Sequence, residues 1–161
     1  MPQQQVIPVQ LKAVVPTANG AALFLGTEEK TFVIYVDANV GHAINMFLAG
    51  TEKERPLTHD LMAHVLAAFG AKVERAVIND VKNSTFYARL ILSAENELHQ
   101  RKIIELDARP SDCIAMAIQQ KAPIFVSRVV LDEVDDASDA LKQIETTKEG
   151  EAAGEEDESS T

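Results

Sequence analysis

The densest group of residues able to do chemistry is Asp107, Arg109, Ser111 and Asp112. Two neighbouring carboxylates could hold a hard divalent cation, and such an ion could polarise a phosphoryl oxygen or activate water. Arg109 could contact a phosphate. Spacing alone favours a structural interpretation: Asp112 could complement a helix dipole, Asp107 could cap a strand end, and Arg109 could pair with a nearby carboxylate.

A second polar group is Thr58-His59-Asp60, followed by His64. On a helix Asp60 and His64 would share a face, so they could form a carboxylate-histidine pair or bind metal together. A surface ion pair is the competing interpretation, because two residues are few for a metal site. A neutral His59 in the first helical turn could act as a general base.

The first group is positioned by a predicted strand and a predicted helix. The branched apolar run 103–106 predicts a buried strand, and Pro110 suits the first position of a helix. Apolar residues then recur with helical spacing at Pro110, Cys113, Ile114, Ala117 and Ile118. Pro123 ends the pattern, and 124–126 predicts the next strand. The polar residues therefore lie at a strand-to-helix junction, where α/β proteins often place chemistry.

The same pattern occurs 70 residues earlier, which indicates an internal duplication. Val36-Asp37-Ala38 aligns with Leu106-Asp107-Ala108, and residues 43–46 align with 113–116. Asp37 and His42 then occupy the positions of Asp107 and Asp112. If the two copies face one another, these four side chains could converge.

Alternation, turn residues and four-residue apolar spacing predict the remaining elements. The predicted strands are 9–15, 22–25, 31–36, 72–81, 85–93 and 103–107, and the predicted helices are 40–49, 58–69 and a short turn at 129–131. Thr58 is the expected N-cap of the second helix. The predicted fold class is α+β: one domain with a curved mixed or antiparallel sheet, packed helices and a duplicated strand-strand-helix unit.

The net charge of −10 is concentrated at the C-terminal end. Residues 1–131 hold 13 Lys+Arg and 13 Asp+Glu, whereas residues 132–161 hold 2 and 12. We therefore expect a globular domain over 5–135 and an acidic, largely disordered tail over 136–161, with a short helix at 137–145 and disorder from Thr146 onward. The neutral domain lends no electrostatic support to nucleic-acid binding and does not exclude it.

Other features favour a cytoplasmic protein that does not bind membranes. No apolar run approaches the roughly 20 residues that span a bilayer, and the N-terminal residues lack a basic region followed by an apolar core. The single cysteine, Cys113, excludes an internal disulfide. Because Cys113 lies on the predicted buried stripe, we expect a packed thiol rather than a nucleophile.

Several motifs together resemble the bifunctional nuclease family, also described as a conserved bacterial domain of formerly unknown function. They are RPLTHDL at 55–61, FGAKVERAVINDVKNSTFYARL at 69–90, LDARPSDCIAMAI at 106–118 and APIFV at 122–126. The resemblance covers about residues 9–135. The combination of THDL with DARPSD is specific.

The resemblance implies a compact domain that associates with itself as a dimer or larger homo-oligomer, and nuclease activity on DNA and RNA, which has been attributed to plant relatives. The resemblance also implies roles for the matching residues. The catalytic residues would be His59, Asp60, Asp107, Arg109 and Asp112, and the substrate-binding residues would be Arg89, Arg109 and Ser111. The ligands of Mg²⁺ or Mn²⁺ would be Asp107 and Asp112. One segment departs from the family pattern. Many relatives have acidic residues at the start of the first helix, where this chain has Val40-Gly41-His42.

Two functions from different classes follow. The first is a metal-assisted phosphodiesterase that cuts nucleic acid, with Asp107 and Asp112 holding the metal, Arg109 on the phosphate and His59 as base or phosphate contact. The alternative is a non-catalytic regulatory or protein-interaction domain, in which Arg109 pairs with Asp60 or Asp107 inside the fold. A small-ligand sensor at the interface of the two copies is a third hypothesis.

Overall fold

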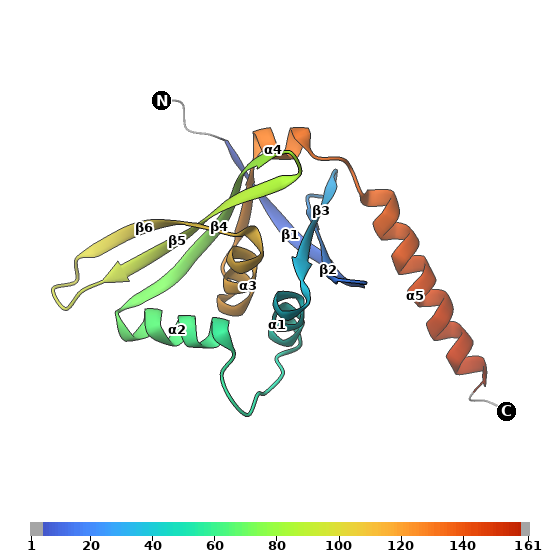
Figure 1. The fold of residues 1–161 in the computed structure, drawn as a ribbon, viewed down its shortest axis with the longest axis horizontal. Helices are drawn as coiled ribbons and strands as arrows, with labels where there is room; N and C mark the ends of the chain where they lie inside the picture. The colour runs from blue at the N-terminus through green and yellow to red at the C-terminus, as the bar shows by residue number, and fades with distance from the viewer. Residues whose placement is uncertain (1–4, 159–161) are drawn as a thin grey trace.

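The computed structural model describes residues 5–158, which form a seven-stranded sheet with helices packed on it (Figure 1). The strands are β1 (Val6–Thr17), β2 (Gly20–Gly26), β3 (Thr31–Asp37), β4 (Ala71–Lys82), β5 (Thr85–Glu95), β6 (Arg101–Ala108) and β7 (Ile124–Ser127). The helices are α1 (Ala38–Ala49), α2 (Thr58–Ala68), α3 (Pro110–Gln120), α4 (Arg128–Glu133) and α5 (Ser138–Glu158). The strand order is β3-β2-β1-β7-β4-β5-β6. The predicted α+β class with a mixed sheet is confirmed.

The sheet is built from two copies of one unit arranged about β7. In each copy three strands form an antiparallel meander that runs outward from the centre, and a helix follows the outermost strand. Strand β7 pairs antiparallel with β1 and parallel with β4, so β1 and β4 run in opposite directions. This arrangement is what a pseudo-twofold axis through the sheet produces, and it agrees with the predicted duplication.

Helices α1 and α3 pack on the same face of the sheet, and their buried residues share one core with the inward side chains of both meanders. Ile44 of α1 and Ile114 of α3 are fully buried. Helix α1 lies close to β2 because residue 41 is glycine: a Cβ there would come within 2.8 Å of the Cβ of Ala21. The start of the first helix therefore has no room for a larger side chain at this position.

Most element positions agree with the sequence prediction to within a few residues. Gly50 caps α1 in the left-handed conformation, with φ of 63°, and Pro110 occupies the first turn of α3. The predicted pairing of strand 85–93 with 103–107 is the β5–β6 ladder. One cap was predicted wrongly, because the N-cap of α2 is Leu57 and Thr58 is the first helical residue. Asp60 accepts a hydrogen bond from the N–H of Leu57, which holds residue 57 in the cap position.

The C-terminal segment also differs from its prediction. Helix α5 continues to Glu158, whereas disorder was expected from Thr146. Its side chains from Glu145 to Gly154 are exposed, so burial does not hold this part in place. Glu is the commonest residue of this segment and has a high intrinsic helix propensity, whereas the sequence prediction gave more weight to the lack of burial. Residues 1–4 and the last part of the predicted tail, 159–161, lie outside the described residues.

Only the first turns of α5 pack on the domain, and the rest extends from it (Figure 1). Leu141 is buried against Ala22 and Phe24, on the face of β2 opposite to α1. Among residues 5–158, no helix combines the length and the apolarity needed to cross a bilayer.

We expect Leu141→Ala to destabilise the protein by about 2 kcal/mol, near the lower limit for buried leucines, because the Leu141 cluster is small. Chemical denaturation followed by circular dichroism measures this change. The matched control is Leu98→Ala, which removes a side chain that is 76% exposed. Equal effects of the two substitutions would show that α5 does not pack on the sheet.

Candidate functional site

The carboxylate of Asp112 joins two predicted site residues that are far apart in sequence. Its Oδ1 lies 3.1 Å from Nε2 of His59, and its Oδ2 accepts a hydrogen bond of 2.8 Å from Nε of Arg109. Asp112 and His59 belong to the first turns of α3 and α2, and Arg109 is the N-cap of α3. The structure thus assembles an Asp-His pair with an arginine beside it.

Arg109 extends this group to the first copy. Its Nη1 lies 3.8 Å from Oδ2 of Asp37, whose Oδ1 accepts a hydrogen bond from the N–H of Val40 and so caps α1. We call Asp37, His59, Arg109 and Asp112 the Asp112 cluster. It connects the N-terminal ends of α1, α2 and α3.

The side chains of the Asp112 cluster differ in their exposure to solvent. The side chain of His59 is 10% exposed, that of Asp112 is 29% exposed and that of Arg109 is 66% exposed. The guanidinium is therefore open to an incoming anion, and its contact with Asp37 is too long for a strong hydrogen bond. If Nε2 of a neutral His59 donates to Asp112, Nδ1 is left able to accept a proton.

The same contacts control the pKa of Asp112. Burial by itself would raise this pKa, but the hydrogen bonds from Arg109 and His59 outweigh burial and hold the pKa below its usual value. In return, the hydrogen bond to Asp112 raises the pKa of Arg109. Asp112 is therefore an anion at neutral pH and orients both partners.

Asp60 lies in a neighbouring group and does not join the Asp112 cluster. It accepts hydrogen bonds from the Leu57 N–H at 2.8 Å, from Lys53 at 3.1 Å and from Gln119 at 3.1 Å. Burial would raise its pKa, but the hydrogen bond from Lys53 and the other two outweigh it, so the pKa of Asp60 is lowered. Within residues 5–158, no hydrogen bond or ion pair joins Asp60 to His64. Asp60 therefore fixes the loop before α2 to α3.

The remaining predicted site residues are not drawn into the Asp112 cluster. Asp107 and Arg89 are exposed and lie opposite each other in the β5–β6 ladder. His42 is exposed on α1, and Ser111 is buried in the first turn of α3. The hydrogen bonds and ion pairs of the described part of the chain include none made by the side chains of Asp107, Arg89 or His42. Of the four side chains expected to converge, Asp37 and Asp112 do so through Arg109.

The predicted metal ligands do not fit a metal in this arrangement. Both oxygens of Asp112 are engaged by Arg109 and His59, and the described residues contain no group of three or more His, Cys, Asp or Glu side chains placed to hold an ion. The close packing of Gly41 on β2 also leaves no room for an acidic side chain there. A bound Mg²⁺ or Mn²⁺ ion stays a prediction.

Cys113 lies directly behind the Asp112 cluster and is fully buried. Burial raises the pKa of its thiol to about 12, and the nearby charges of Asp112 and Asp107 act in the same direction. The thiol is therefore protonated at neutral pH and cannot serve as a nucleophile. This agrees with the predicted packed thiol.

Two residues beside the site were not singled out by sequence reasoning. The ring of Phe47 meets the ring of His59 edge to face, with centroids 6.4 Å apart, and Nζ of Lys53 lies 4.5 Å from the Phe47 centroid. Phe47 lies within the predicted helix 40–49, and Lys53 lies between that helix and the predicted helix 58–69. Neither has a spacing to His59 that a sequence pattern would reveal.

Comparisons with known proteins point to one family. The model of the bifunctional nuclease domain matches residues 23–139. Two similar relatives are the uncharacterized proteins MT1877 and Rv1829 of Mycobacterium tuberculosis, from strains CDC 1551 and H37Rv. Each is 35% identical over 124 residues, covering 71% of this chain and 71% of the relative. The residues matched by the family model, 23–139, include the whole Asp112 cluster.

We predict that Asp112→Asn lowers the free energy of unfolding at neutral pH. The free energy of unfolding should also fall less steeply as the pH becomes acidic. A carboxylate whose folded pKa is lowered stabilises the fold above its unfolded pKa of about 3.9, and this contribution is lost as pH falls through the folded pKa. Urea denaturation at neutral pH and at several values below about pH 4 measures both effects.

Asp132→Asn is the matched control for this prediction, because Asp132 is 65% exposed and its contact with Arg128 is 3.9 Å long. The control should keep the acid dependence of the wild type. If Asp112→Asn lost stability at acid pH as steeply as the wild type does, the assigned role of Asp112 would be wrong.

Proposed function

We propose a function from the premise that this chain belongs to the bifunctional nuclease domain family: it hydrolyses phosphodiester bonds of DNA or RNA at the Asp112 cluster. The observation that carries the proposal is the bridging of His59 and Arg109 by Asp112. A cationic phosphate contact and an oriented histidine are the two parts that such a hydrolysis needs from side chains. We place this activity in the cytoplasm.

In the proposed reaction the exposed guanidinium of Arg109 binds the phosphate and stabilises the charge that builds on its oxygens. His59 accepts a proton from the attacking water, whose oxygen bonds to phosphorus as the bond to the leaving oxygen breaks. The leaving oxygen takes a proton from solvent water and the protonated His59 returns its proton to solvent, so charge and atoms balance. Asp112 holds the histidine ring in place and stabilises its protonated form.

The burial of His59 sets a condition on this mechanism. Its side chain is 10% exposed, so the attacking water must reach Nδ1 through the small exposed part of the ring. The loose contact between Arg109 and Asp37 would then give way to a phosphate oxygen. Arg55, which precedes α2, is exposed and supplies further positive charge for a polyanion, whereas the charge of Lys53 is paired with Asp60.

We expect His59→Gln, Asp112→Asn and Arg109→Ala each to reduce cleavage about a hundredfold or more, because each removes a group used in the transition state. Labelled single-stranded DNA and RNA are incubated with each protein in Mg²⁺, Mn²⁺ or a chelator. Asp107→Ala, assayed in parallel, tests the metal prediction: loss of metal-dependent cleavage in that variant would assign the reaction to Asp107.

Matched controls separate this activity from contaminating nucleases. His99→Gln changes another histidine that lies 3.0 Å from a carboxylate, that of Glu95, and Arg128→Ala removes another exposed arginine. Both should cleave like the wild type. Equal cleavage by all proteins would indicate contamination, and no cleavage by any would favour the non-catalytic regulatory or protein-interaction function.

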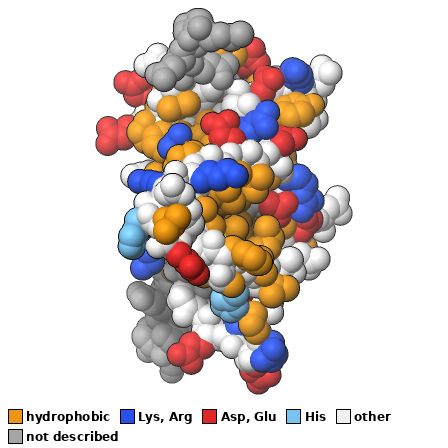
Figure 2. All heavy atoms as spheres, turned by 90° about the vertical axis from the view of Figure 1, so that its left-hand side faces the viewer, with side chains coloured by type: hydrophobic (Ala, Val, Ile, Leu, Met, Phe, Trp, Pro, Cys, Tyr) orange, Lys and Arg blue, Asp and Glu red, His pale blue; other side chains and the backbone are white. Residues whose placement is uncertain are grey.

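Self-association is a second part of the proposal. Leu61, Val65 and Phe69 follow one another at four-residue steps along α2 and are 58%, 48% and 81% exposed. Figure 2 shows hydrophobic side chains gathered across the middle of the face that carries α2 and the β5–β6 hairpin. Apolar side chains gathered in this way mark interaction surfaces, and we propose that a second copy of the chain covers this one.

We expect the double substitution Leu61→Glu with Phe69→Glu to convert an oligomer into a monomer, because four carboxylates would face each other or remain buried in a dimer. Light scattering coupled to size-exclusion chromatography measures the mass. Val129→Glu, at an apolar residue of α4 that is 47% exposed, should leave the mass unchanged. A wild-type protein that is already monomeric would contradict the proposal.

A further inference from the structure

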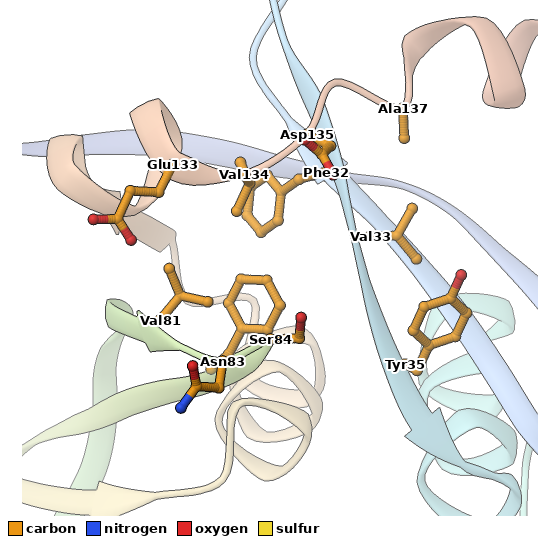
Figure 3. A pocket seen from close by; sticks show the side chains of 11 residues that line it. Phe32, Val33, Tyr35, Val81, Asn83, Ser84, Glu133, Val134, Asp135 and Ala137 are labelled. Atoms are coloured by element: carbon orange, nitrogen blue, oxygen red, sulfur yellow. The ribbon is translucent and has the colours of Figure 1, made fainter.

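A cavity of about 480 Å³ lies along the outer edge of β3, where Phe32, Val33 and Tyr35 line it (Figure 3). The β4–β5 hairpin forms the opposite wall, and the segment between α4 and α5 forms one end. We call it the edge cleft. It shares no residue with the Asp112 cluster, and its size is within the range of ligand sites in proteins.

Alternate residues of β3 direct their backbone N–H and C=O groups away from β2, toward the edge cleft. Thr31 directs its N–H to Oδ1 of Asp136 at 3.1 Å and its C=O to the N–H of Ala137 at 2.7 Å, both away from β2. Backbone groups alternate in direction along a strand, so Val33 and Tyr35 point theirs the same way. The segment after α4 satisfies Thr31 and then leaves the strand as α5, so it does not cover these two residues.

Side chains on both faces of this edge line the cleft. On one face Phe32 stacks on Phe86, with ring centroids 6.0 Å apart, and Val81 lies beside them (Figure 3). On the other face lie Val33 and Tyr35, and Tyr35 is 74% exposed. A strand added to β3 would place its side chains alternately on these two apolar surfaces.

The negative charge at the rim of the cleft favours binding of a strand that carries positive charge. Glu133 and Asp135 are exposed at the rim, and the residues that line the cleft include no Lys or Arg. An extended segment that carries lysine or arginine as well as apolar residues is complementary to both features.

We propose that the edge cleft binds an extended, basic and apolar peptide segment of a partner protein, which pairs with β3 as an eighth strand. Main-chain hydrogen bonds to Val33 and Tyr35 supply affinity, and the aromatic surface and the acidic rim supply specificity. The hairpin wall is already formed, because its turn residues Asn83 and Ser84 adopt the two positive φ values, 50° and 63°, of a tight hairpin turn.

The probe is the fluorescein-labelled peptide KVKVKVK, with EVEVEVE as the charge control and an N-methylated KVKVKVK as the backbone control. Fluorescence polarisation measures affinity, and hydrogen exchange of the Val33 and Tyr35 amides measures pairing. We expect KVKVKVK to bind at least about tenfold more tightly than either control and to slow exchange at both amides. Equal binding of the N-methylated peptide, protection of β6 amides instead, or no binding of KVKVKVK would overturn the proposal.

Two variants of the full chain complete the test. Tyr35→Pro removes an outward N–H without breaking the ladder to β2, so it should abolish binding while thermal unfolding shows an intact fold. Glu133→Lys with Asp135→Lys should reverse the preference toward EVEVEVE, whereas Asp139→Lys, outside the cleft, should not. If Tyr35→Pro lowers the molecular mass of the protein without peptide, a second copy occupies the cleft and the partner-peptide proposal is wrong.

Discussion

The rest of the structure depends on the carboxylate of Asp112. A partly buried anion with hydrogen bonds on both oxygens is stable only while its partners stay in place, because losing one leaves an unpaired charge away from water. Its partners are His59 at the start of α2 and Arg109 at the start of α3. Through Arg109 the constraint reaches Asp37 and the start of α1. Helices α2 and α3, from distant parts of the chain, are thereby tied at their N-terminal ends, whereas the contact of Arg109 with the start of α1 is a loose one of 3.8 Å. The one charge that orients the histidine also holds these two helices together.

The pseudo-twofold symmetry explains why these residues meet. Helices α1 and α3 pack together, and their N-caps are Asp37 in the first copy and Arg109 in the second. Equivalent positions near a twofold axis approach each other, so identical charged side chains would repel. Here the two N-caps carry opposite charges. Asp37 satisfies the free N–H of Val40, whereas Arg109 makes no side-chain cap and instead bonds Asp112 in its own first turn. The two halves of the domain thus hold an asymmetric site on a pseudosymmetric frame.

The fold was largely predictable because its local signals agree with its global pattern. The hairpin turns, Gly50 at the end of α1 and Pro110 at the start of α3 each fix an element through its own backbone chemistry. The site was predicted only as a set of candidates. Its members and the meeting of Asp37 with Asp112 were anticipated, but the offset of 70 residues aligned Asp37 with Asp107, whereas the N-cap role aligns Asp37 with Arg109. The carboxylate that pairs with Arg109 is decided by the directions of side chains on three helices. No spacing within one sequence encodes these directions.

Strand β3 connects the Asp112 cluster and the edge cleft while keeping their charges apart. Asp37 lies at one end of the strand, and Thr31, which binds the acidic segment through Asp136, lies at the other. Six residue steps of an extended chain span about 20 Å, whereas exposed charges are screened over about 8 Å at physiological ionic strength. The acidic rim of the cleft therefore has little influence on an anion at Arg109. The net charge of the chain is for this reason a poor guide to what the Asp112 cluster can bind, and the local balance around Arg109, Lys53 and their carboxylate partners decides it.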